Sequence, residues 1–132
     1  MTENEMARII VDACYRIHSD LGPGLLELVY EVVLARELTA QGLQVERQVP
    51  VPVQWKDVQF DEGFRADLIV EDKVLIELKS VEKLARVHGK QLLTYLRLSG
   101  KRLGLLVNFG EALIRDGIKR VVNGLPDDEP DA

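Results

Sequence analysis

The sequence predicts a single α/β domain in which a mixed central β-sheet is flanked by helices. Apolar residues recur every three or four positions near the start of the chain and again over 86–98, which is typical of amphipathic helices. Between these segments, residues 45–78 alternate with a period of two or form short apolar runs, which is typical of strands. A length of 132 residues suits one hydrophobic core. The predicted order of elements is α-α-β-β-β-β-α-β-α.

The first two predicted helices are separated by a glycine-rich break. The first spans residues 6–20 and carries Cys14 on its apolar face, so we expect this thiol in the core. Gly22-Pro23-Gly24 ends it, and a second helix follows over 25–38 with Gly42 as its C-terminal cap. The two helices form a hairpin or an elbow.

Four strands are predicted before the third helix. Residues 45–53 alternate strictly, and their prolines mark an exposed edge or face of the sheet. A short strand at 58–60 follows a turn. Two β-rich runs, 64–70 and 74–78, are joined across residues 71–73, which indicates a hairpin.

The remaining elements follow the same signals. The third helix spans 86–98 and ends at Ser99-Gly100, and the continuous apolar run 103–109 predicts a strand buried on both faces. Residues 112–122 are expected to form a short final helix. The domain then covers residues 1–124, and residues 125–132 form an acidic tail that we expect to be disordered.

Composition excludes several classes of protein. No run approaches the ~20 apolar residues of a membrane span, and the first residues lack the order of a secretory signal, so we expect a cytoplasmic protein that does not contact membranes. Cys14 is the single cysteine, so neither an intrachain disulfide nor a cysteine-rich zinc site can form, and His18 and His88 are the only histidines. Any bound metal should therefore be a hard cation held by carboxylates.

The charge distribution permits a cationic face on an acidic protein. The net charge is −5, but the tail holds four of the 22 acids and no base, which leaves 17 bases against 18 acids. Six basic residues and no acid occur between positions 83 and 110, namely Lys83, Arg86, Lys90, Arg97, Lys101 and Arg102. This stretch forms either a cationic surface or a solvated helix face that neighbouring acids compensate.

Two acids and a lysine lie in otherwise apolar strands. Alternation places Glu77 and Lys79 on one face of the 74–78 run. If residues 71–73 form a three-residue loop, Asp67 lies directly across from Glu77, and two carboxylates so placed can share one divalent ion. If Asp72-Lys73 forms a two-residue turn instead, the carboxylates face opposite sides of the sheet. A purely structural alternative is an ion pair between Lys79 and one of the two acids.

Two helical faces carry further polar groups. Glu27, Tyr30 and Glu31 share one face of the second helix, where two acids repel each other unless a cation or a base lies between them. His88, Gln91 and Tyr95 share one face of the third helix. Taken alone, a solvated acidic face is the more common explanation for Glu27 and Glu31, and an interfacial aromatic is the more common explanation for Tyr30 or Tyr95.

These residues carry a resemblance to a known family. The stretch from Gly24 to Tyr30 resembles the motif that gives the GxxExxY protein family its name. Asp67 with Glu77-Leu78-Lys79 resembles the core motif of the PD-(D/E)xK nuclease superfamily, and Gln91 to Tyr95 resembles the QxxxY element of its RecB-like branch. The resemblance covers residues 8–122 and implies a restriction-endonuclease-like core. Ala66 stands where the superfamily name has proline, a position that supplies no ligand.

The resemblance also implies roles for the residues. Asp67 and Glu77, with the backbone carbonyl of Leu78, would hold Mg²⁺ or Mn²⁺, and Glu27 would reach the same ion directly or through water. Lys79 would orient or help deprotonate the attacking water, while the metal lowers the pKa of that water and neutralises charge on the phosphate. The remaining residues act through these or on the phosphate: Gln91 and Tyr95 would position the phosphate or the lysine, and Glu31, His88 and Tyr30 would supply outer hydrogen bonds.

Three functions are therefore compatible with the sequence. The first is a divalent-metal-dependent nuclease that acts on DNA or RNA. The second is a non-catalytic module on the same fold that binds nucleic acid or protein, and the third is a small dimerising protein with an internal ion-pair network. Since one small module buries only ~600–1,000 Å² on DNA, we expect a homodimer or a partner protein, with 45–53, Trp55 and Phe60 as the contact surface.

Overall fold

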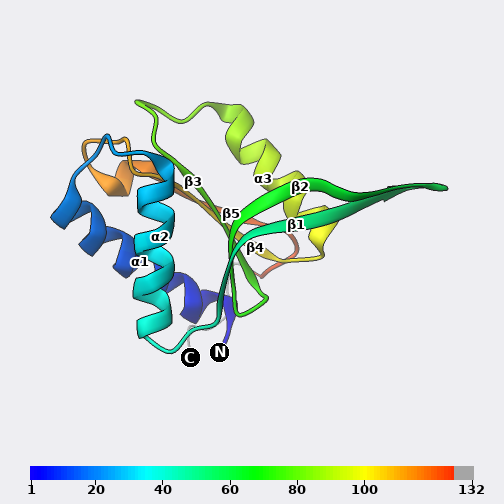
Figure 1. Ribbon diagram of the computed structural model, residues 1–132, viewed down its shortest axis with the longest axis horizontal. Coiled ribbons are helices and arrows are strands. Elements are labelled where there is room, and N and C mark those ends of the chain that lie inside the picture. Colours follow the sequence, from blue (N-terminus) through cyan, green and yellow to red (C-terminus); the bar gives the residue numbers. More distant parts are fainter. Residues whose placement is uncertain (127–132) are drawn as a thin grey trace.

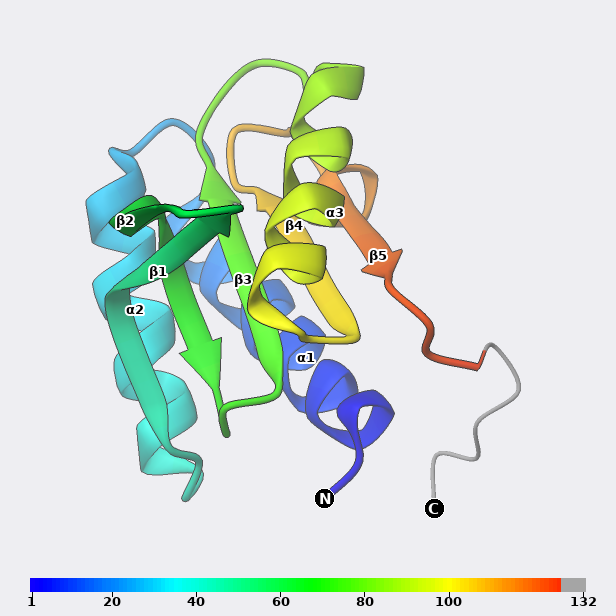
Figure 2. The ribbon, with the colours of Figure 1, turned by 90° about the vertical axis from the view of Figure 1, so that its right-hand side faces the viewer.

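The computed structural model describes residues 1–126, which form one mixed sheet between two helical layers (Figures 1 and 2). The elements in chain order are α1 (Glu3–Leu21), α2 (Glu27–Ala40), β1 (Val45–Trp55), β2 (Val58–Val70), β3 (Val74–Lys79), α3 (Arg86–Ser99), β4 (Leu103–Asn108), η1 (Ile114–Gly117) and β5 (Ile118–Val122). The strands lie in sequence order across the sheet. Only the β3–β4 pair is parallel among these strands. The predicted fold class is confirmed.

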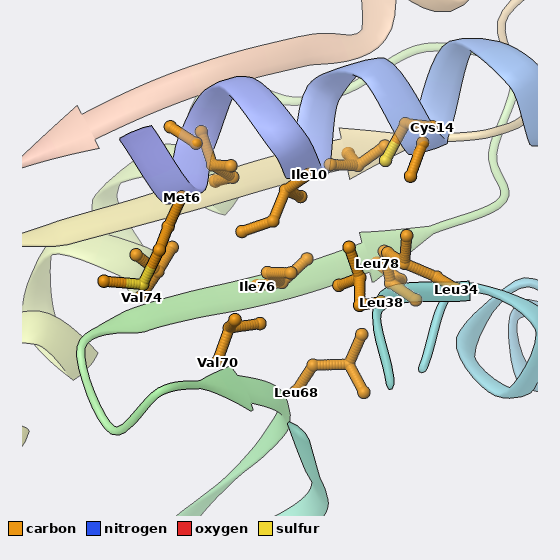
Figure 3. Packing of buried hydrophobic residues seen from close by; sticks show 14 of the residues in the cluster. Met6, Ile10, Cys14, Leu34, Leu38, Leu68, Val70, Val74, Ile76 and Leu78 are labelled. Carbon is orange, nitrogen blue, oxygen red and sulfur yellow. The ribbon is translucent and has the colours of Figure 1, made fainter. Parts of the chain in front are cut away.

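The two faces of the sheet carry separate cores. The larger core lies against α1 and α2, where Ile10, Ile76 and Leu78 are buried (Figure 3). Cys14 is buried there too, as predicted, and its burial raises the pKa of the thiol to about 12. The smaller core lies under α3 and consists of Ala66, Ile69, Leu75, Leu92, Leu96 and Leu106. Because side chains alternate along β3, Glu77 shares the face of Leu75, beneath α3.

The hairpin that carries the acids has the three-residue loop. Val70 pairs with Val74 and Leu68 with Ile76, so residues 71–73 form the turn. Glu71 and Asp72 both adopt left-handed backbone conformations, with φ of 52° and 54°, which closes this loop. The two-residue alternative is excluded by this register.

The strands predicted at 58–60 and 64–70 are one continuous strand, β2. Residues 61–63, between these two predicted strands, lie in a bulge: β1 advances by two residues, from Val51 to Val53, while the paired residues of β2 are four apart, Phe64 and Phe60. A Cβ at Gly63 would come within 1.9 Å of the Val53 side chain, so the bulge requires glycine there. Beyond the bulge, β1 and β2 project from the body as a two-stranded arm (Figure 1).

The predicted final helix over 112–122 is wrong. The segment forms a 3₁₀ turn, η1, and then β5, which pairs antiparallel with β4. Its apolar residues fall at three- and four-residue spacing, which imitates a helix, but the segment Ile118–Val122, with β-branched residues at 118, 121 and 122, forms the outer strand beside β4. The prediction for β4 is confirmed, since all six of its residues are buried.

Three further predictions concern the edge strand, the end of α3 and the C-terminal tail. The prolines of β1 do mark an edge, because β1 is an outer strand of the sheet. Gly100 ends α3 in the left-handed conformation, with φ of 70°. The acidic residues 127–132 lie outside the described residues, and Leu125 just before them is buried in the larger core. No helix within residues 1–126 is long and apolar enough to cross a membrane.

Candidate active site

The β2–β3 hairpin brings Asp67 and Glu77 together. Asp67 Oδ2 accepts a hydrogen bond from the backbone N–H of Leu78 at 2.8 Å. Glu77 Oε1 accepts one from the backbone N–H of Asp67 at 3.3 Å. Each carboxylate is therefore fixed by the strand that carries the other, and both are half-buried.

Both carboxyl groups are shifted toward the neutral form. The pKa of Glu77 is raised to about 8, first by burial and then by the charge of Asp67. Burial also raises the pKa of Asp67, to which the charges of Glu31 and Glu27 add, against the opposing hydrogen bond from Leu78. The charged forms of both groups are therefore disfavoured first by burial and then by neighbouring acidic side chains.

Lys79 lies two residues beyond Glu77 on the same face of β3 and is half-buried. Its charge lowers the pKa of Glu77, but by less than burial and Asp67 raise it. Within residues 1–126, Lys79 makes no ion pair with Asp67 or Glu77. The alternative that Lys79 forms an ion pair with Asp67 or Glu77 is therefore not what the structure shows.

The loop after β3 is held in place by a buried amide. Asn108, at the end of β4, donates to Val81 O at 2.9 Å and accepts from Val81 N–H at 3.0 Å. The backbone N–H of Phe109 donates to Lys79 O at 2.9 Å. Asn108 is fully buried, and together with the Phe109 bond it fixes Lys79 and the loop that follows it against the end of β4. Sequence reasoning missed it, because an asparagine ending an apolar run is also typical of an ordinary turn.

Glu27 approaches the pair from the other side, at the first turn of α2. It is exposed, and its charge raises the pKa of both Asp67 and Glu77, so it lies within electrostatic reach of both. The preceding loop is tied to the site, because Ser80 Oγ donates to Leu25 O at 2.5 Å. This bond links the end of β3 to the start of α2.

Tyr30 supports this loop and does not contact the carboxylates. Its hydroxyl donates to Gly22 O at 2.6 Å and accepts from Leu25 N–H at 3.1 Å. Its ring is fully buried and stacks on Phe109, with centroids 4.3 Å apart. Its influence on the site is therefore indirect, through the turn that places Glu27.

Glu31 is buried and paired, in an arrangement that the sequence did not reveal. Its carboxylate accepts from Arg47 at 2.8 and 3.1 Å and from Gln48 Nε2 at 2.5 Å. Gln48 Nε2 also lies 3.4 Å from Asp67 Oδ1. Gln48 has a φ of 51°, a conformation that side-chain-bearing residues seldom adopt and that no sequence pattern signals. Gln48 thereby links Glu31 to Asp67.

The three residues predicted on α3 differ in their contacts. His88 Nδ1 accepts from the backbone N–H of Ala85 at 3.1 Å, so it caps its own helix. Gln91 is exposed and makes no hydrogen bond within residues 1–126. Tyr95 stacks on Phe64 of β2 with centroids 4.0 Å apart, and burial together with the charges of Glu77 and Asp67 raises the pKa of its hydroxyl. Tyr95 therefore faces the acidic pair.

The donor atoms present suit a hard cation, although the side chains do not form a closed cage. Within residues 1–126, no three acidic, histidine or cysteine side chains converge closely enough to hold a metal. Two carboxylates nevertheless lie side by side, and Glu77 accepts a single hydrogen bond from the described residues. Clustered carboxylate oxygens are the donors that Mg²⁺ prefers, typically completed by water. A role for the Leu78 carbonyl as a ligand stays a prediction.

Comparison with known proteins gives one result that agrees with this geometry. The family model of the PD-(D/E)XK nuclease superfamily matches residues 4–121. No curated protein and no solved structure matches the chain significantly. The match includes Glu27, Asp67, Glu77 and Lys79. Because it spans nearly all of the described fold, the chain belongs to the PD-(D/E)XK nuclease superfamily.

Proposed function

We propose that this protein is a divalent-metal-dependent nuclease whose active site is built on Asp67, Glu77 and Lys79. One observation carries the proposal: two half-buried carboxylates are each held by the strand that carries the other, and their pKa values are raised first by burial and further by neighbouring acidic charges. Strongly shifted titratable groups beside a cationic side chain are typical of catalytic sites. Membership of the nuclease superfamily supports the reaction class.

We assign the chain more finely to the GxxExxY family. Gly24, Glu27 and Tyr30 have separate tasks that fit such a motif. Gly24 has a φ of 95° in the loop before α2, Glu27 faces the acidic pair, and Tyr30 ties the loop. Gln91 and Tyr95, on the α3 face that meets β2, support the RecB-like branch.

The metal ligands in this proposal are Asp67 and Glu77, with Glu27 acting directly or through water. A bound Mg²⁺ or Mn²⁺ would neutralise charge on the phosphate and lower the pKa of a water molecule. Oxygen ligands alone favour these ions over soft metals. Cys14, which is buried in the core, is not available as an alternative ligand.

Lys79 acts on the nucleophile and the phosphate. Its charge acts on Glu77 without a close ion pair to either acid, which leaves the ammonium group able to orient a water molecule or to donate hydrogen bonds to phosphate oxygens. Tyr95 faces the same space from α3, and its raised pKa keeps the hydroxyl protonated as a hydrogen-bond donor. Gln91, one helical turn earlier, would position the phosphate.

Cleavage of end-labelled substrates tests the proposal. Single- and double-stranded DNA and RNA are incubated with Mg²⁺ or Mn²⁺ and with wild type, Glu77→Gln or Lys79→Met, purified identically. Glu46→Gln is the matched control, because Glu46 is an exposed acid on β1. We expect metal-dependent cleavage by wild type and the control, and a loss of at least about 10²-fold in both site variants.

Calorimetric titration with Mn²⁺ separates binding from chemistry. We expect Glu77→Gln to weaken Mn²⁺ binding and Lys79→Met to leave it intact, since Lys79 is not a proposed ligand. Metal binding without cleavage of any substrate would favour a non-catalytic module on the same fold. Binding that is indifferent to both Glu77→Gln and Asp67→Asn would refute the proposed site.

A further inference from the structure

One face of α3 carries cations that the described part of the chain leaves uncompensated. Of the six basic residues between positions 83 and 110, Lys101 pairs with Asp72 at 3.0 Å and Arg102 with Glu3 at 3.1 Å. Lys83 lines a hollow with the acids Glu82, Glu111 and Asp116. That leaves Arg86, Lys90 and Arg97, which are exposed and make no ion pair within residues 1–126.

These three residues form a stripe along the helix. At 100° per residue, Arg86, Lys90 and Arg97 fall within about 40° of one another, and they span about 16 Å of helix axis. No acid occurs between Arg86 and Ser99, although the chain holds 22 acids. We name these three residues the basic stripe.

The basic stripe and the active site lie on opposite flanks of α3. His88, Gln91 and Tyr95 are centred about 155° from the stripe around the helix axis. The buried residues Leu92 and Leu96 face the sheet, so the arc from stripe to site crosses the outward side of the helix. On that outward side Val87 and Thr94 are exposed, whereas at its C-terminal end Arg97 and Leu98 line a hollow together with residues of the β1–β2 arm.

The outward side itself is uncharged. It carries Val87, Thr94 and Leu98, of which Val87 is 49% exposed and Leu98 is 45% exposed. The Thr94 hydroxyl bonds to Lys90 O within the helix and so presents its methyl group outward. A small, apolar strip between a cationic flank and a catalytic flank suits base edges better than phosphates.

We propose that α3 enters the major groove of duplex DNA. The inference rests on the proposed nuclease function and names its substrate. A helix is about 10–12 Å across with its side chains, and the major groove of B-form DNA is about 12 Å wide. One backbone then lies against the active-site flank, and the opposite backbone lies along the basic stripe. A single strand cannot occupy both flanks at once, and the major groove of A-form RNA is too narrow for a helix.

Binding of fluorescent 20-base-pair DNA tests the inference without requiring cleavage, with Ca²⁺ in place of Mg²⁺. The stripe variant Arg86→Gln/Lys90→Gln/Arg97→Gln is compared with a charge-matched control, Arg36→Gln/Arg115→Gln/Lys119→Gln, whose side chains are also exposed. Three lost phosphate contacts lower the slope of log K against log salt by about 2–3 and the affinity at 0.1 M salt by about 10²-fold. The control is expected to retain most of the affinity.

Groove competition on the wild type gives a readout that needs no variant. Methyl green, which occupies the major groove, should displace the protein, and netropsin, which occupies the minor groove, should not. The inference fails if the stripe variant binds like the control, if netropsin alone competes, or if duplex RNA or single-stranded DNA binds as tightly as duplex DNA. Stripe-dependent DNA binding without cleavage in Mg²⁺ would instead preserve this inference and refute the nuclease proposal.

Discussion

Replacing Glu77 by glutamine should stabilise the metal-free protein at alkaline pH. The pKa of Glu77 is raised from 4.5 to about 8, first by burial and then by Asp67. Between these two values the folded protein retains a proton that the unfolded chain has lost. The free energy of unfolding of the wild type therefore falls as pH rises from about 4.5 to 8 and levels off above it. Glutamine carries no charge, so the variant lacks this contribution.

The size of the effect follows from the shift. A pKa change from 4.5 to about 8 corresponds to an upper limit of about 5 kcal/mol. Water penetration and local rearrangement relieve part of this in a half-buried group, so about 2–3 kcal/mol is expected. At pH 9 Glu77→Gln should exceed the wild type in stability by that amount, and near pH 5 the two should be nearly equal.

Urea unfolding followed by circular dichroism between pH 5 and 9 measures this difference. Glu46→Gln serves as the control, since Glu46 is exposed and should track the wild type. Saturating Mn²⁺ should close the gap at pH 9 by stabilising the wild type alone. A variant that loses stability in parallel with the wild type over this range would refute the reasoning, because the destabilising charge would then not be on Glu77.

Three other perturbations address the residues around the site. Arg47→Ala leaves the Glu31 carboxylate buried with Gln48 as its remaining partner, and should lower the free energy of unfolding in urea by about 2–3 kcal/mol. A decrease of less than about 0.5 kcal/mol would contradict the importance of the Arg47–Glu31 pair. Tyr30→Phe removes two hydrogen bonds and should cost about 1–2 kcal/mol, with faster amide exchange at Leu25; unchanged exchange would argue against the tie. We also expect the β1–β2 arm to mediate a homodimer through Trp55, which is 68% exposed. Analytical ultracentrifugation at high micromolar concentration should show a dimer for the wild type and a monomer for Trp55→Ser. A monomeric wild type would contradict this expectation.

The pairing of Asp67 with Glu77 could be considered from the sequence because the hairpin that carries them has only two plausible registers. With side chains alternating, the loop at residues 71–73 either aligns Asp67 with Glu77 or sends them to opposite faces. The structure has the aligned register. Lys79 followed from the same alternation. Local sequence therefore contained the three central residues of the proposed site, because all of them lie on one hairpin.

The parts that escaped prediction depend on contacts between distant segments. Arg47 and Gln48 reach Glu31 from a strand that begins after the second helix, and Gln48 does so from a strained backbone conformation. β5 was mistaken for a helix because its apolar spacing fits both periods, and only pairing with β4 decides between them. Neither feature is encoded in a local pattern.

The electrostatics of the site argue against a purely structural role for the acidic residues. A structural network would place Lys79 in an ion pair with Asp67 or Glu77, as the chain does elsewhere for Glu31 and Arg47. Instead, backbone N–H groups hold the two carboxylates against each other, and Lys79 stays unpaired within the described residues. Such an arrangement destabilises the fold at neutral pH unless a proton or a cation is added. Residues that lower the stability of the fold in this way are typical of functional sites, and a bound divalent cation would offset the loss of stability.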